Sequence, residues 1–438
     1  MKKFLLIASI LLSLFVFCFS ESAVPFPNHT EYTAGCIRPS LWTQEELDNH
    51  VREYYDMWKE RYLTDVPNSE KSMKFVNFAF LDYDWLDQTV ATVSEAHGYG
   101  MMILASMAGY DEKAKEDFDA MYNYFKSYPS VIDSRLMSWK QLKVKDAEGN
   151  LTGVKDVEDN DSVTDGDLDI AYALLMADKQ WGSDGEIGYK QEALNILDGI
   201  LDSEVHPEYG YLLLGDWSLF KNEKLDGSRA SDYFINHMTF FSEIDEENSA
   251  RWEKVRETTI NICTEIYRNY SENCGLLPDF IVRTEDGKYI PAEGEYLETE
   301  HDGDHNWNSC RVPWRIPLDY IVSGNSELLE QVQAMNSWIK EEAGMEPLKI
   351  NPGYYILNGP AGTPIIRDWE GTDMSFVSPF AVAAMVGAEN QGWLDNLWIS
   401  IISDNWDTGT PFEESAYFPN TIRMLVMIIV SGNWWPLN

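Results

Sequence analysis

The stretch DSVTDGDLDIAYALLMADKQWGSDGE, residues 161–186, decides the fold. Its segment Ile170–Ala177 is apolar on every side, and a helix of that kind is stable only when other helices enclose it. Asp165, Asp167 and Asp169 stand where a polar loop leads into this helix. The stretch therefore predicts a buried helix that holds carboxylates at its N-terminal end.

A second stretch, SEAHGYGMMILASMAG from Ser94 to Gly109, has the same design. One carboxylate, Glu95, precedes another apolar helical segment. The chain also contains 16 Trp and 23 Tyr residues, and aromatic rings stack well on the apolar faces of sugar rings. Carboxylates fixed at the ends of buried helices in such a chain indicate acid–base chemistry on a sugar polymer.

Amphipathic helical segments alternate with the apolar ones. The first begins with a capping box, Thr43 and Glu46, and has its apolar residues on one face. Glycine often separates an apolar segment from the amphipathic segment that follows, as at Gly109 and Gly182, which is typical of a helix C-cap. This alternation predicts an (α/α) barrel, an inner ring of helices inside an outer ring. An irregular helical bundle is the alternative that periodicity leaves open.

Two long segments lack helical periodicity, Ser134–Asn160 and Asp279–Asn308, and both are expected to be loops. They carry Trp139, Trp307 and many carboxylates. Long loops at one end of a rigid scaffold are where functional sites usually form. We therefore expect the site at these loops.

The N-terminus is typical of a secretory signal peptide over residues 1–23, cleaved after Ser20 or Ala23, since two lysines precede an apolar run that is short for a membrane anchor. No linker or low-complexity segment divides the remainder, so residues 24–438 are expected to form a single catalytic domain. The mature protein is expected to be secreted, with no membrane association after cleavage.

The formal net charge of −40 excludes nucleic acid and anionic membranes as partners. Such a charge serves solubility, and it would also attract a cationic polymer such as chitosan. Four cysteines follow the signal peptide, and sequence cannot choose among their pairings. Cys263 and Cys274 are the first pair to test.

Four motifs together carry a resemblance to a known family: SEAHGYGMM (94–102), TDGDLDIAYALLMADKQWGSDG (164–185), SDYF (231–234) and NWNSCRVPWR (306–315). In this order they resemble glycoside hydrolase family 8, over the chain from about Cys36 to the C-terminus. That family contains endoglucanases, lichenases, chitosanases and some xylanases. The resemblance implies an all-α fold, an (α/α)6 barrel with a substrate cleft in the loops at one end, and an inverting mechanism with no cofactor.

The resemblance assigns the general acid to Glu95. The residues agree, because a carboxyl beside an apolar helix is desolvated and its pKa rises. The family's central acid, which grips the sugar at the cleavage point, falls on Asp165. Asp167 is expected to support it from behind. Capping of the following helix is the alternative role for both aspartates.

The general base departs from the most familiar family pattern, which has Asp where this chain has Asn308. A neutral amide cannot take a proton from water. The resemblance to a subgroup of chitosanases, lichenases and cellulases, which also has Asn here, implies a glutamate in the preceding insertion. Glu298, in Y-L-E, is the predicted base. Glu293, Glu295 and Glu300 are its rivals.

By the same resemblance, the residues predicted to bind the sugar are aromatic, and Arg311 is expected to orient the site carboxylates through bidentate bonds. Asn308 is grouped with these binding residues. The block His301–His305, HDGDH, fits no standard zinc or calcium spacing, so no metal site is predicted. The predicted sugar-binding aromatics are Trp139, Trp217, Tyr233 and Trp307.

The sequence thus predicts a monomeric, secreted, inverting endo-hydrolase of a β-1,4-linked or mixed-linkage glucan, with a β-linked polysaccharide as its partner. A chitosanase on the same scaffold is the first alternative. A xylanase is disfavoured, because those relatives generally keep the aspartate that is absent at position 308. A non-catalytic carbohydrate-binding protein is the alternative of a different class, supported only by Asn308.

Overall fold

The computed structural model describes residues 22–78, 89–158, 160–405 and 407–437. Residues 1–21 of the expected signal peptide lie outside the described residues. Among the described residues, no helix has the length and hydropathy needed to cross a membrane.

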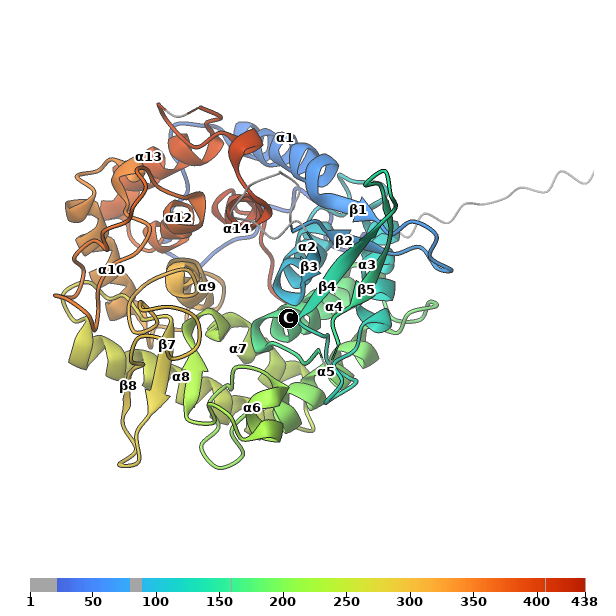
Figure 1. The fold of residues 1–438 in the computed structure, drawn as a ribbon. Helices are drawn as coiled ribbons and strands as arrows, with labels where there is room; N and C mark the ends of the chain where they lie inside the picture. Colours follow the sequence, from blue (N-terminus) through green and yellow to red (C-terminus); the bar gives the residue numbers. More distant parts are fainter. Residues whose placement is uncertain (1–21, 79–88, 159, 406, 438) are drawn as a thin grey trace, which may run out of the picture.

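Helices are arranged in two concentric rings (Figure 1). Each inner helix contacts the next around the ring, and the last, α14, contacts the first, α2, which closes it. The (α/α)6 barrel is therefore confirmed. The inner helices are α2 (Ser94–Ser106), α4 (Thr164–Trp181), α7 (Ile235–Ile244), α9 (Val312–Ser323), α12 (Pro379–Ala384) and α14 (Tyr417–Val430). The outer helices are α1 (Gln44–Tyr62), α3 (Ala114–Ser127), α5 (Tyr189–Ser203), α8 (Ser249–Tyr270), α10 (Leu329–Glu342) and α13 (Gln391–Ile402), and the short helices α6 (Asp216–Lys221) and α11 (Met374–Val377) lie between them in sequence.

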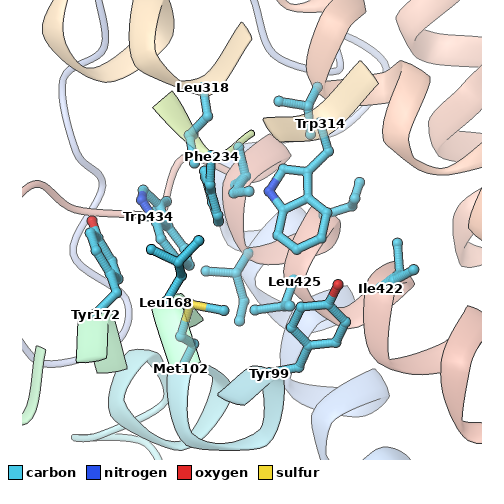
Figure 2. Packing of buried hydrophobic residues seen from close by; sticks show 14 of the residues in the cluster. Tyr99, Met102, Leu168, Tyr172, Phe234, Trp314, Leu318, Ile422, Leu425 and Trp434 are labelled. Atoms are coloured by element: carbon cyan, nitrogen blue, oxygen red, sulfur yellow. The ribbon is translucent and has the colours of Figure 1, made fainter. Parts of the chain in front are cut away.

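The barrel core is filled by large side chains of the inner helices. In Figure 2, Tyr99 and Met102 of α2, Leu168 and Tyr172 of α4, and Leu425 of α14 converge on one another. The C-terminal segment also enters the barrel, where the ring of Trp434 stacks on Tyr172 with centroids 5.9 Å apart. Burial on all sides explains why the inner helices are apolar all round.

The outer helices bury one face only. In α1, the predicted capping box of Thr43 and Glu46 is present, and the predicted apolar face is buried from Leu47 to Tyr62. Gly182 follows α4 with a φ of 72°, and Gly324 follows α9 with a φ of 78°. A positive φ is common at the residue that ends a helix, and glycine adopts it without strain.

The two long segments expected to be loops contain short antiparallel strands. One sheet joins β3 (Val90–Val93), β4 (Lys140–Lys145) and β5 (Leu151–Asp156), and another joins β6 (Gly227–Arg229), β7 (Phe280–Arg283) and β8 (Tyr289–Pro291). A third pairs β1 (Leu63–Asp65) with β2 (Lys74–Val76). In β4, polar and apolar residues alternate, and the carboxylate of Asp146 stabilises the turn that follows by accepting from the backbone of Glu148 and Asn150. These strands brace the loops around the site.

Cys263 and Cys274, the first pair to test for a disulfide, are not bonded to each other. Each of these cysteines, like Cys36 and Cys310, is a free thiol in the described structure. Cys263 and Cys274 are fully buried, where they serve as small apolar side chains.

Candidate active site

A cleft of about 680 Å³ opens at the end of the barrel where inner helices begin. Glu95 and Asp165 are the second residues of α2 and α4, Arg311 directly precedes α9, and Tyr417 is the first residue of α14. The chemistry-bearing side chains are thus held by the rigid inner ring. The residues that line the cleft are Phe78, Val93, Glu95, Trp139, Asp161, Val163, Asp165, Leu214, Trp217, Arg229, Leu297, Glu298, Trp307, Asn308, Arg311, Tyr417 and Phe418.

Glu95 is a buried carboxyl whose tip reaches the cleft, with 13% of its side chain exposed. Arg311 Nη1 donates to its Oε2, and the Tyr417 hydroxyl donates to its Oε1 over 3.4 Å. Burial raises the pKa of Glu95 to about 7; Arg311 opposes this shift and the negative charge of Asp165 adds to it. Glu95 can therefore carry a proton near neutral pH, as a general acid must.

Asp165 has the opposite electrostatic environment. Its carboxylate lies 3.1 Å from Arg311 Nη1 and 3.2 Å from Arg229 Nη2, and it accepts from the Gly166 amide over 2.9 Å. Burial favours the neutral form, but the two arginines outweigh it and hold the pKa of Asp165 below its ordinary value. The neighbouring carboxyls are thus divided into a proton carrier, Glu95, and a permanent anion.

Arg311 joins these carboxyls to the opposite wall of the cleft. Its Nη1 serves both Glu95 and Asp165, while its Nη2 and Nε donate to Oδ1 and the backbone oxygen of Asn308 over 3.0 Å each. The predicted role in orienting carboxylates is consistent with this geometry, but the expected bidentate pairing is replaced by one nitrogen shared between two carboxylates. Below it, the Tyr99 hydroxyl is shared between Arg311 and Arg315.

Asn308 fixes Glu298 in the same cleft. Its Nδ2 donates to Glu298 Oε2 over 2.9 Å and to the buried Asp279 Oδ2 over 3.4 Å. Because Asn308 Oδ1 already accepts from Arg311, its amide group has a single orientation. An aspartate at 308 would instead face two further carboxylates. Among the described residues, the rival glutamates Glu293, Glu295 and Glu300 do not line the cleft.

Asp279 was missed in the sequence, although it lies directly before β7. One of its oxygens accepts from Asn306 N, Ser309 N and Ser309 Oγ over 2.7–3.0 Å. Burial raises the pKa of Asp279 to about 7, and its hydrogen bonds to Ser309 moderate this shift. Asp279 holds the 306–309 turn and with it Asn308.

Three of the four predicted aromatics, Trp139, Trp217 and Trp307, line the cleft, and Trp139 is 43% exposed. The prediction that Tyr233 binds the sugar is wrong. Its side chain is fully buried in the barrel core and does not line the cleft. It directly follows a short 3-10 helix, Ala230–Asp232.

Other residues of the cleft wall were not predicted. Arg229 lies two positions before the first residue of the SDYF motif, which could have drawn attention to it. Tyr417 and Phe418 are the first two residues of α14, and no sequence signal marks them.

In the described structure, Asp167 forms no hydrogen bond with Asp165, and its side chain does not cap α4. Its Oδ1 accepts from the Met137 amide over 2.8 Å, two residues before Trp139. Burial raises the pKa of Asp167 well above its ordinary value. Asp167 thus anchors the segment that presents Trp139 and does not bond Asp165.

The HDGDH block is part of the loop architecture. Asp302 and Asp304 each accept three backbone amides, Asp302 from residues 297–299 and Asp304 from residues 356–358. Across the described residues, no group of three or more His, Cys, Asp and Glu side chains is arranged to hold a metal ion.

Comparison with known proteins agrees with this architecture. Residues 48–432 match the family model described as glycosyl hydrolases family 8. The chain is 38% identical to a beta-glucanase of Niallia circulans, over 96% of this chain and 93% of that protein, and 32% identical to an endoglucanase of a Bacillus species (strain KSM-330), over 94% and 81%. The structure is similar to that of an apo beta-1,3-1,4-glucanase from Paenibacillus sp. X4, with a TM-score of 0.82 and 38% identity over 95% of this chain and all of that one. The chain therefore belongs to glycosyl hydrolase family 8 and is a glycoside hydrolase.

Proposed function

We propose that the protein is a secreted endo-hydrolase of β-1,4-linked glucan, including mixed-linkage β-glucan, and that it inverts the anomeric configuration. One observation carries the mechanism: Glu95, with its raised pKa, and Glu298 line one cleft and are linked through Arg311 and Asn308. The two carboxyls are separated by these side chains, and an inverting pair needs such a separation to admit a water molecule. The names of the similar glucanases support the glucan substrate.

In this mechanism Glu95 donates its proton to the glycosidic oxygen as the bond to the leaving sugar breaks. Glu298 accepts a proton from a water molecule that attacks the opposite face of the ring. The ionised Asp165 stabilises the positive charge that develops on the sugar. Trp139, Trp217 and Trp307 offer apolar ring faces on which glucose units stack.

The charge distribution in the cleft favours a neutral glucan over chitosan. Asp165 is paired with Arg229 and Arg311, and Asp161 is paired with Lys221 over 2.6 Å. These carboxylates are not open to the ammonium group of a glucosamine unit, which would also approach two arginines. The net charge of −40 belongs to the whole chain, and it serves solubility.

A side-by-side assay tests the substrate. Purified protein is expected to release reducing ends fastest from barley β-glucan and carboxymethylcellulose, and more slowly from chitosan and xylan. Faster release from chitosan would overturn the glucan assignment in favour of the chitosanase. Binding of cello-oligosaccharides without any new reducing ends would show a non-catalytic carbohydrate-binding protein.

The proposal that the protein is secreted is based on the expected signal peptide at residues 1–23. We propose that residues 24–438 form one catalytic domain and that the protein acts as a monomer.

A further inference from the structure

The proposed base stands on a loop, whereas Glu95 and Asp165 stand on helices of the barrel. Glu298 lies between β8 and Asn308, in a segment without regular secondary structure. Its side chain is exposed in the cleft, and among the described residues its carboxylate accepts one hydrogen bond, from Asn308. A base must be held within a fraction of an ångström to be effective, so something has to fix the backbone of this loop.

Asp302 fixes that backbone. Its Oδ2 accepts from the amides of Leu297 and Glu298 over 2.7 and 2.9 Å, and its Oδ1 accepts from the amide of Thr299 over 2.8 Å. Three consecutive amides, the middle one that of Glu298 itself, thus converge on one fully buried carboxylate. The arrangement uses both oxygens.

Asp302 is itself held in place by its surroundings. Its amide donates to the Thr299 carbonyl over 3.2 Å, and the Glu295 amide donates to the same carbonyl over 2.7 Å. The next residue, Gly303, packs so closely that a Cβ there would lie 2.1 Å from the Ala292 carbonyl. The loop cannot shift without breaking these contacts.

We propose that Asp302 is a positioning residue for the general base: it sets the place of Glu298 by clamping the backbone from residue 297 to 299. The inference rests on the proposed role of Glu298. This role gives a function to Asp302 within the HDGDH block, for which no metal site is predicted. It also explains why position 302 needs a carboxylate. An Asn would present an amide NH₂ to donor N–H groups and leave buried donors unpaired.

Asp304 provides a matched control in the same block. Its Oδ1 accepts from the amides of Ile356, Leu357 and Asn358 over 2.8–3.1 Å, and its side chain is also fully buried. The segment that it clamps contributes no residue to the lining of the cleft. Asp302→Asn and Asp304→Asn therefore each remove one charge and disturb three backbone amides. Asp304→Asn also disturbs the bonds of Asp304 Oδ2 with His301 Nδ1 and Asn358 Nδ2, but only Asp302 accepts from the amides of residues 297–299, which include Glu298.

The experiment measures kcat and KM on barley β-glucan for Asp302→Asn, Asp304→Asn, Glu298→Gln and the double variant Asp302→Asn/Glu298→Gln. Asp302→Asn is expected to lower kcat by about 10- to 100-fold, the effect of displacing a reacting group by about 1 Å, with KM little changed. Asp304→Asn is expected to keep kcat near wild type at a similar loss of Tm. In the double variant, the Asp302 substitution is expected to have no further effect on kcat, because its effect passes through Glu298.

The outcomes separate the two claims. If Glu298→Gln keeps near wild-type kcat, the base assignment fails and the inference falls with it. If Glu298→Gln is inactive but Asp302→Asn behaves like Asp304→Asn, or lowers kcat further in the double variant, the inference alone is overturned. Should Asp302→Asn not fold, Asp302→Ser, which keeps one acceptor oxygen and adds no NH₂ group, replaces it in the same cycle with the same expected pattern.

Discussion

Replacing Glu95 by Gln is expected to lower kcat on barley β-glucan by a factor of about 10²–10⁴, the usual contribution of a general acid. The substitution is isosteric, and Gln matches the neutral form that the raised pKa of Glu95 favours up to about pH 7. The amide oxygen of Gln can accept from Arg311, and its NH₂ group can donate to the Tyr417 hydroxyl, which lies at the other oxygen position. Circular dichroism and Tm should therefore stay close to those of the wild type.

The leaving group separates loss of the acid from general damage. A dinitrophenyl cellobioside needs little protonation to depart, so Glu95→Gln should retain most of its activity on that substrate. In the wild type, kcat/KM on β-glucan should fall as the pH rises through about 7, because the acid must be protonated and its pKa is raised to that value. Equal losses on both substrates, or a rate that stays flat to pH 9, would argue against Glu95 as the acid.

Replacing Glu298 by Gln is expected to lower kcat by a similar factor of about 10²–10⁴, since a neutral amide cannot take a proton from water. This loss should not depend on the leaving group, because the water attacks the sugar whatever departs. Gln keeps an oxygen for the hydrogen bond from Asn308. Measuring kcat for both substrates, with Tm as the check on folding, tests the expectation.

The rival glutamates are the natural controls for this prediction. Glu293→Gln, Glu295→Gln and Glu300→Gln should each remain near wild type, because these side chains do not line the cleft. The smaller variant Glu298→Ala should regain activity with azide, which can occupy the place of the carboxylate and the water. Loss of activity in one of the three control variants would move the base to that residue.

The barrel could be predicted from the sequence because its inner helices have an unusual composition. Segments such as Ile170–Ala177 are apolar all round, and only enclosure by other helices makes such a segment stable. The strands could not be predicted in the same way. β4 and β5 are short and half-exposed; β4 pairs with β3, which lies about 50 residues earlier in the chain, and β5 pairs with β4.

Site residues could be predicted from the sequence where they belong to a recognisable motif. Glu95, Asp165 and Glu298 come from three distant segments, and resemblance together with the chemistry of carboxylates brought them to one cleft. The prediction for Tyr233 was wrong because a sequence motif does not show whether a side chain points into the core or into the cleft. Asp279 and Asp302 were missed as site residues because they act through backbone amides, and sequence does not show which amides a buried carboxylate will meet.

The stereochemistry of the first product tests the central claim most directly. If Glu95 and Glu298 act on opposite faces of one sugar through a single water molecule, a β-linked glucan must yield a new reducing end in the α configuration. Proton NMR during the first minutes, before mutarotation equilibrates the anomers, should show the α signal rising first. A β signal that rises first would mean retention of configuration and would contradict the account.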